Sequence, residues 1–252
     1  MSRLTRRVFL MSAAALAGCR SMGKSEAGLQ GPVPPVRAPS VGQSWRYAMR
    51  DVYSKALIET QVDTVAAVGA SVEIASLSEG RPKNAKSSWG SAWLKKYIPS
   101  REDTGPLPSE IQDPWGQVRV DPHWGEVQVY ETAIPLWPSQ LRPGWSNIFN
   151  TRYKTPQDQS GLPWTQTITA MSWEPINVAA GRFNALRVAN RISFRSTDFS
   201  RTACERREIL WFVPEIGRWA VRQSQGTYYR TNSFDDLPVT EPGFRWELLS
   251  YT

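Results

Sequence analysis

The chain has 252 residues, of which 40% are hydrophobic and 21% are charged, as in ordinary globular proteins. No apolar run after residue 18 is long enough to span a membrane. The formal net charge is +7, but the chain has no basic tail and no recognition motif, so nucleic acid is excluded as a partner.

The first 18 residues predict a signal peptide. Arg3, Arg6 and Arg7 precede an apolar run over residues 8–17. A membrane-spanning helix needs roughly 20 apolar residues, so this run fits the apolar region of a leader that is removed. The alternative is a buried amphipathic first helix, but the apolar residues are continuous and not spaced three and four apart.

Two motifs in this leader resemble bacterial export signals. Thr5-Arg6-Arg7-Val8-Phe9-Leu10 resembles the twin-arginine motif, with Met11 where the motif has Lys. Leu16-Ala17-Gly18-Cys19 resembles a lipobox. The lipobox resemblance implies that Cys19 takes a diacylglycerol through a thioether, and that cleavage then makes it the acylated first residue.

These resemblances also imply a location. Lipoprotein modification adds two or three acyl chains, enough for stable anchoring, whereas a single chain binds only reversibly. Arg20 stands where an inner-membrane lipoprotein would have Asp, which favours the outer membrane. We therefore expect a lipid-anchored envelope protein that faces the periplasm. Residues 19–40, rich in Gly, Pro and Ser, would be the lipidated cysteine and a flexible tether.

Strand patterns dominate the chain after the tether. Residues 62–68 and 71–77 predict a hairpin around Gly69-Ala70. Residues 184–197 alternate, with Leu186, Val188, Ile192 and Phe194 on one face. Further strands are expected over 205–213, 218–225 and 244–251, with a turn at 214–217.

A nine-residue repeat predicts two more strands. Trp115-Gly-Gln-Val-Arg-Val recurs from residue 124 as Trp-Gly-Glu-Val-Gln-Val, and a turn separates the two copies. Convincing long amphipathic helices are absent. We therefore expect a mainly β fold with little helix: an antiparallel curved sheet, either a sandwich or a partial barrel. Two β regions, residues 41–140 and 141–252, could be separate domains or one continuous domain.

The C-terminal half resembles an exported proteobacterial β-domain family of unknown function. The similarity lies in residues 181–188 (GRFNALRV), residues 211–219 (WFVPEIGRW) and the final ELLSY segment. These motifs are turn and core residues. The resemblance implies a curved sheet, similar to periplasmic lipid-carrier folds, and no particular activity.

Catalytic signals are weak. His123 is the only histidine, and no nucleophile motif accompanies it, so we expect a solvated turn residue. No spacing indicates a metal site or a cofactor. Cys204, the only thiol left if Cys19 is acylated, is expected to lie buried in a strand; a catalytic thiol or an inter-chain disulfide is the alternative.

Candidate ligand-binding residues are aromatic and basic. They are Trp89, Trp93, Trp115 and Trp124, and an arginine face of Arg187, Arg191 and Arg195, with Arg218 and Arg222 as further members. Tryptophans can stack on sugars or bury in lipid, and arginines can bind phosphate or carboxylate. Core packing is the alternative for the tryptophans, and is expected for Trp211 and Trp219. Cross-strand ion pairs with Glu205 and Glu208 are the alternative for the arginines.

The sequence thus favours a lipid-anchored envelope protein that acts without catalysis. It would be a binding, carrier or scaffold module for a lipid, glycan or protein partner, attached to the membrane through its N-terminal acyl chains. The alternative is a carbohydrate-active hydrolase, which needs only two carboxylates.

Overall fold

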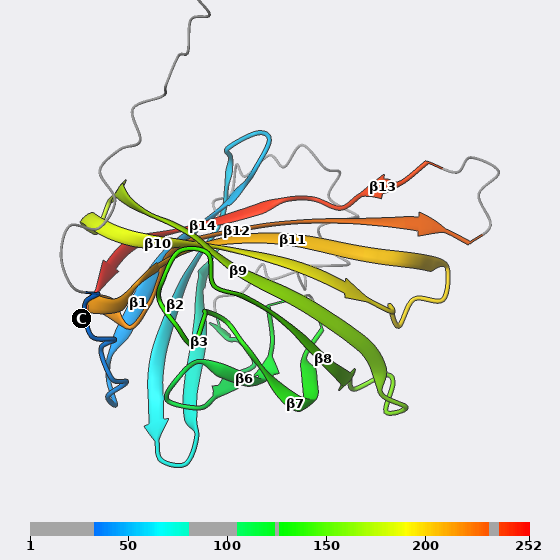
Figure 1. The fold of residues 1–252 in the computed structure, drawn as a ribbon, viewed down its shortest axis with the longest axis horizontal. Helices are drawn as coiled ribbons and strands as arrows, with labels where there is room; N and C mark the ends of the chain where they lie inside the picture. Colours follow the sequence, from blue (N-terminus) through cyan, green and yellow to red (C-terminus); the bar gives the residue numbers. More distant parts are fainter. Residues whose placement is uncertain (1–32, 81–104, 124–125, 232–236) are drawn as a thin grey trace, which may run out of the picture.

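The computed structural model describes residues 33–80, 105–123, 126–231 and 237–252. It confirms a mainly β, antiparallel fold with little helix (Figure 1). The strands are β1 (Ser44–Asp51), β2 (Leu57–Val68), β3 (Val72–Gly80), β4 (Gly105–Pro106), β5 (Glu110–Gln112), β6 (Gln117–Asp121), β7 (Gln128–Pro135), β8 (Ser146–Lys154), β9 (Leu162–Val178), β10 (Gly181–Phe194), β11 (Arg201–Val213), β12 (Arg218–Arg230), β13 (Val239–Thr240) and β14 (Phe244–Tyr251). A 3₁₀ turn, η1, covers Pro214–Ile216.

The sheet closes into a barrel. Among the described residues, twelve strands follow the order β11-β10-β9-β8-β7-β6-β5-β3-β2-β1-β14-β12, and β12 pairs back onto β11. β4 and β13 add short pairings to β3 and β12. Closure leaves the twelve strands without a free edge, so the expected curved sheet is a complete barrel.

The predicted hairpins are confirmed: β2 pairs with β3, and β11 pairs with β12. β10 pairs with β11 and also with β9, a strand that was not predicted from the sequence. The first repeat copy supplies most of β6, and the described part of the second copy supplies only Gln128 and Val129 at the start of β7, with Val120 opposite Val129. Regular alternation explains β10, in which Leu186, Val188 and Ile192 are buried and Arg191 is exposed.

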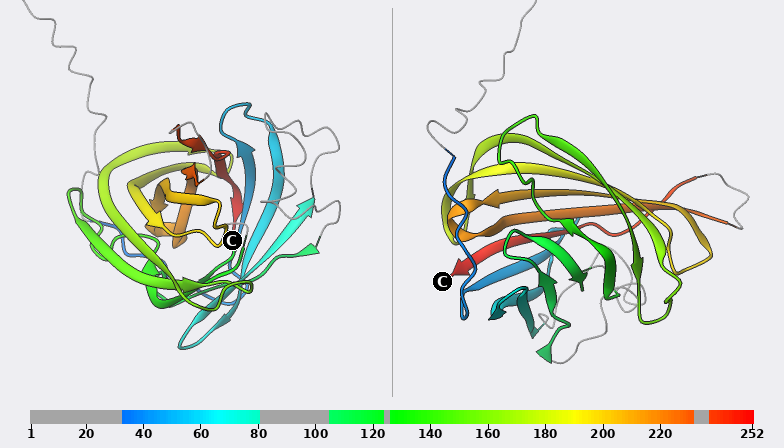
Figure 2. Two further views of the ribbon diagram at one scale, coloured as in Figure 1. Left: turned by 90° about the vertical axis from the view of Figure 1, so that its right-hand side faces the viewer. Right: turned by 60° about the horizontal axis from the view of Figure 1, so that its bottom comes forward.

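The barrel has two ends, because antiparallel strands place successive turns at alternate ends. The end with the β2–β3, β5–β6, β9–β10 and β11–β12 turns is called the tether end, since the N-terminal segment reaches the barrel there (Figure 2). The opposite end, with the β6–β7, β8–β9 and β10–β11 turns, is called the far end.

Residues 33–43, called the N-terminal strap, are bound to the tether end. The backbone N–H of Arg37 donates to the carbonyl of Pro214 at 2.8 Å, and Gln43 Nε2 donates to the carbonyl of Ile216 at 3.1 Å. Gly217 ends η1 with φ +67°, and a Cβ there would lie 2.6 Å from the Arg37 carbonyl oxygen. Glycine is therefore required both by the turn and by the close approach of the strap.

Aromatic rings fill much of the barrel interior. Tyr47 stacks on Trp219 at 4.1 Å between centroids, and Trp137 stacks on Phe212 at 4.6 Å. Trp219 is thus a core residue, as predicted. The prediction for Trp211 is wrong: it lies half-buried on the outer face of β11, since Leu210 and Phe212 take the inward positions. In the part of the chain that is described, no helix could cross a membrane.

Candidate functional site

A network of ion pairs lies inside the barrel, around Arg218. This guanidinium is 1% exposed; its Nη2 lies 3.0 Å from Asp63 Oδ2, and its Nη1 lies 3.1 Å from Glu110 Oε1. Asp63 accepts two further hydrogen bonds, from Gln61 Nε2 at 2.6 Å and Ser76 Oγ at 2.7 Å. Burial of a charge is tolerated when it is paired and hydrogen-bonded in this way.

Arg222 forms the second buried pair, further along β12. Its Nε donates to Glu208 Oε1 on β11, and Glu208 Oε2 accepts from Asn190 Nδ2 at 3.0 Å. The guanidinium lies near two indoles, 5.9 Å from the Trp219 centroid and 5.8 Å from that of Trp246. Arg222 is therefore held by a carboxylate and by two aromatic rings.

His123 joins the same network, so the prediction of a solvated histidine is wrong. Its side chain is 5% exposed, with Nδ1 2.8 Å from Asp121 Oδ1 and 3.6 Å from Glu110 Oε2. Asp121 Oδ1 also accepts the backbone N–H of His123 at 2.9 Å, which folds the turn back over the interior. Nε2 has no hydrogen-bond partner within the described residues, so the ring is held through Nδ1.

Electrostatic interactions within the network favour the ionised forms of Asp121 and Arg218. Burial by itself raises the pKa of Asp121, but the hydrogen bond and charge of His123 outweigh it and hold this pKa well below its usual range. Burial by itself lowers the pKa of Arg218, but Glu110 and Asp63 raise it above its ordinary value. Both groups stay ionised at neutral pH.

The prediction that Arg218 and Arg222 belong to an outer arginine face is therefore wrong. Residues 218–222 are all buried, so β12 shows no alternation from which the sequence could assign a face. A register shift at the Trp211–Phe212 step of β11 accompanies this run. The partner Asp63 lies 155 residues away in the chain, so no local pattern could pair it with Arg218.

The remaining arginines of the predicted face do lie outside the barrel. Arg191 on β10 stands directly opposite Arg207 on β11, and both are exposed. Arg191 Nη2 lies 3.0 Å from Glu205 Oε1, the cross-strand ion pair considered from the sequence. Glu208 is not part of it, because it points inward. Arg195 is exposed just beyond β10.

Trp211 extends this outer surface toward β14. Arg187 lies 5.8 Å and Arg245 5.4 Å from its ring centroid, and its Nε1 donates to Glu174. We call this surface the outer arginine face; its members are Arg187, Arg191, Arg195, Arg207, Trp211 and Arg245. The sequence predicted three of these six and missed Arg207, Trp211 and Arg245, which the register of neighbouring strands brings alongside.

The tryptophan candidates do not gather at one site with these arginines. Trp115 is 72% exposed in the β5–β6 turn, whereas the outer arginine face lies on β10, β11 and β14. Trp89, Trp93 and Trp124 lie outside the described residues, as do Arg6, Arg7 and Cys19. Within the described residues, no group of three His, Cys, Asp or Glu side chains is placed to hold a metal ion.

Cys204 is buried in β11, as predicted. Burial raises the pKa of its thiol, which keeps the thiol protonated and slow to react.

Comparison with known proteins finds distant structural similarity only. No family model and no curated protein matches the chain. Two solved structures resemble it. One is a candidate lipoprotein from Parabacteroides distasonis, with a TM-score of 0.46 and 12% sequence identity; the match covers 88% of this chain and 100% of that chain. The other is a candidate exported protein with a YmcC-like fold from Bacteroides fragilis, with a TM-score of 0.46 and 10% sequence identity; the match covers 87% of this chain and 100% of that chain. Likeness at this level carries no conclusion about function, so the function has to be inferred from this chain's own residues.

Proposed function

We propose that this protein is a lipid-anchored envelope protein that acts without catalysis and binds an anionic glycan on its outer arginine face. The acyl anchor would be carried by Cys19, at the end of the leader whose residues resemble a lipobox. Acidic sugar groups would then be bound by guanidinium groups, which pair with carboxylates through parallel hydrogen bonds.

The observation that carries the proposal is the direct opposition of Arg191 and Arg207. Like charges opposite each other on adjacent strands destabilise a sheet. Glu205 pairs with Arg191, while Arg207 has no ion-pair partner within the described residues. An anionic group that lies between the two guanidiniums would relieve this repulsion.

The barrel interior supports a non-catalytic role. The two-carboxylate mechanism of glycosidases needs one carboxyl group that stays protonated near neutral pH. Here Asp63 and Glu110 share Arg218, and His123 keeps Asp121 ionised. The same buried charges would repel an acyl chain, so the interior also favours a role other than lipid carriage.

Binding of a polyuronate, with neutral dextran as the uncharged comparison, tests the proposal. We expect the mature chain to bind the polyuronate, and the double variant Arg191→Ala/Arg207→Ala to lose most of that binding. Arg119→Ala is the matched control, because Arg119 is exposed on β6, away from the outer arginine face. An equal loss in the control, or equal binding of dextran, would contradict a specific site.

Polyglutamate provides a second comparison. Binding of polyglutamate with the same dependence on Arg191 and Arg207 would indicate an acidic protein partner in place of a glycan. The anchor is tested separately by flotation with vesicles: the lipidated chain should float, and the variant Cys19→Ala should not.

A further inference from the structure

The tether end of the barrel exposes several apolar and aromatic side chains. Trp115 in the β5–β6 turn is 72% exposed, and Val41 in the N-terminal strap is 68% exposed. Val68 at the end of β2 and Tyr251 at the end of β14 are also exposed. An exposed apolar group on a protein surface marks a contact site when its members are contiguous.

The register of the strands places Val41, Val68 and Trp115 on neighbouring segments of this end. Gly42, next to Val41, donates its N–H to the carbonyl of Val65, three residues before Val68. Val68 pairs with Val72, and Val72 pairs with Gln112, three residues before Trp115. The strap, the β2–β3 turn and the β5–β6 turn therefore lie next to one another, and each carries one of these exposed residues.

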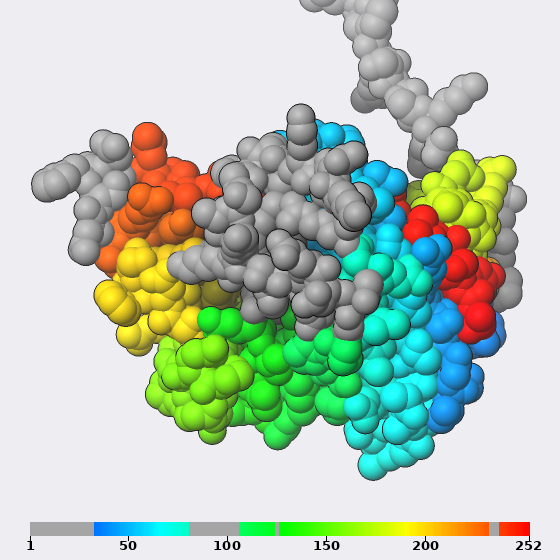
Figure 3. Space-filling view, turned by 180° about the vertical axis from the view of Figure 1, so that it is seen from behind, coloured from blue at the N-terminus to red at the C-terminus, as the bar shows by residue number. Residues whose placement is uncertain are grey.

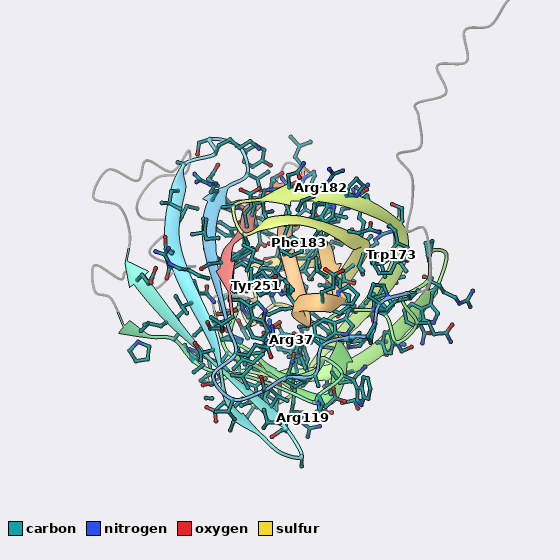
Figure 4. The ribbon with its side chains drawn as sticks, turned by 90° about the vertical axis from the view of Figure 1, so that its left-hand side faces the viewer. Arg37, Arg119, Trp173, Arg182, Phe183 and Tyr251 are labelled. Atoms are coloured by element: carbon teal, nitrogen blue, oxygen red, sulfur yellow. The ribbon has the colours of Figure 1, made fainter. Side chains whose placement is uncertain are left out.

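Arginines border the same end. Figure 4 looks onto it and shows Arg37, Arg182 and Tyr251 around the barrel opening. Arg37 Nη1 donates to the carbonyl of Thr252 at 3.1 Å, and the Tyr251 ring packs on Phe183 at 5.9 Å. Figure 3 shows the blue strap, the red end of β14 and the yellow-green β9–β10 turn side by side at this end.

The described turns and strap of the tether end carry more exposed basic than acidic groups. Arg37, Arg142 and Arg182 are exposed. Of the acidic residues there, Glu215 is exposed, while Asp113 accepts the backbone N–H groups of Trp115 and Gln117 through its Oδ1 at 2.8 Å. The end is thus apolar with a basic border.

The chain reaches its anchor from this end. Fourteen residues, 19 to 32, join Cys19 to the first described residue of the strap. They span at most about 49 Å when fully extended, and a random chain of that length averages about 20 Å. The far end is more distant, because β11 alone has 13 residues, or about 43 Å of strand.

From these observations we propose that the tether end docks on the surface of the anionic phospholipid bilayer that holds the acyl anchor. The inference rests on the lipid anchoring in the proposed function. Trp115 and Tyr251 would lie at the headgroup level, where indole and phenol rings are favoured, and Arg142 and Arg182 would pair with phosphates. The outer arginine face would then stand beside the membrane, open to the periplasm.

Depth-dependent quenching tests the orientation. The full lipidated chain is placed in vesicles of phosphatidylethanolamine and phosphatidylglycerol that contain doxyl-labelled lipid. A bimane label is attached in the variant Trp115→Cys or in the control Phe199→Cys, since Phe199 is 91% exposed at the far end. Cys204 is buried and Cys19 is acylated, so the introduced thiol takes the label.

We expect severalfold stronger quenching at position 115 than at position 199. The double change Arg142→Glu/Arg182→Glu should weaken quenching at 115, whereas Arg230→Glu at the far end should not. Equal or absent quenching at both positions, in a chain that still floats with the vesicles, overturns the docking but leaves the anchor. Disulfide-linked dimers through Trp115→Cys would overturn it in favour of a second copy. Failure to float would instead contradict the anchor.

Discussion

Replacement of Arg218 by methionine should be among the most destabilising single changes in the barrel. The guanidinium is 1% exposed and makes three hydrogen bonds to Asp63 and Glu110. Methionine fills a similar space but leaves two carboxylates buried without their cation. Breaking a buried ion pair from one side costs about 3–5 kcal/mol. In a domain of this size that loss lowers Tm by roughly 6 to 20 °C.

The assay is urea and thermal unfolding of the mature chain with Cys19→Ala, followed by circular dichroism. A compensating variant, Arg218→Met/Asp63→Asn/Glu110→Gln, removes the stranded charges and should recover much of the loss, since the cost arises from unpaired charge and not from the missing side chain. A free energy of unfolding for Arg218→Met within about 0.5 kcal/mol of the parent value is what a surface change would give. That result would mean that the interior solvates the two carboxylates, and it would refute the reasoning.

Three further predictions concern buried groups. Because His123 holds the pKa of Asp121 below its ordinary value, the stabilisation by Asp121 is lost as the pH falls from about 5 toward the folded-state pKa. Asp121→Asn should therefore lower the free energy of unfolding by urea less at pH 3 than at pH 5. Gly116 has φ +79° and a Cβ there would overlap the Trp137 ring, so Gly116→Ala should lose at least about 1–3 kcal/mol. The buried Cys204 thiol has a raised pKa, so in the chain lacking the lipidated cysteine a thiol reagent should react slowly until urea unfolds the protein; rapid native labelling would contradict its burial.

Local alternation explains why much of the barrel could be predicted. One face of β10 is buried and the other is exposed to solvent. Apolar residues such as Leu186 and charged residues such as Arg191 therefore alternate along the sequence as they do across the sheet. The β2–β3 hairpin and the turn at Pro214–Gly217 depend on neighbouring residues only, and glycine and proline mark them. Closure could not be predicted, because the pairing of β1 with β14 joins segments about 200 residues apart.

The interior network was missed for the same physical reason. Arg218 and Glu110 are separated by 108 residues, and each has the composition of a surface residue in its own segment. His123 occupies the turn that was predicted, yet Asp121 draws its ring inward. A charged residue can be buried when an oppositely charged partner lies beside it. When that partner comes from a distant strand, the local sequence shows only the charged residue and predicts that it is exposed.

The two sets of arginine in this barrel therefore have different roles, although they share one side-chain chemistry. Arg218 and Arg222 on β12 are buried and paired, so changing them alters stability. Arg191 and Arg207 are exposed on β10 and β11, and exposed pairs contribute about 0–1 kcal/mol. Replacing Arg191 and Arg207 with alanine should leave the free energy of unfolding nearly unchanged while it removes the proposed anion binding. The proposed anion site and the buried ion pairs share no residue, so binding and stability should be separable by mutation.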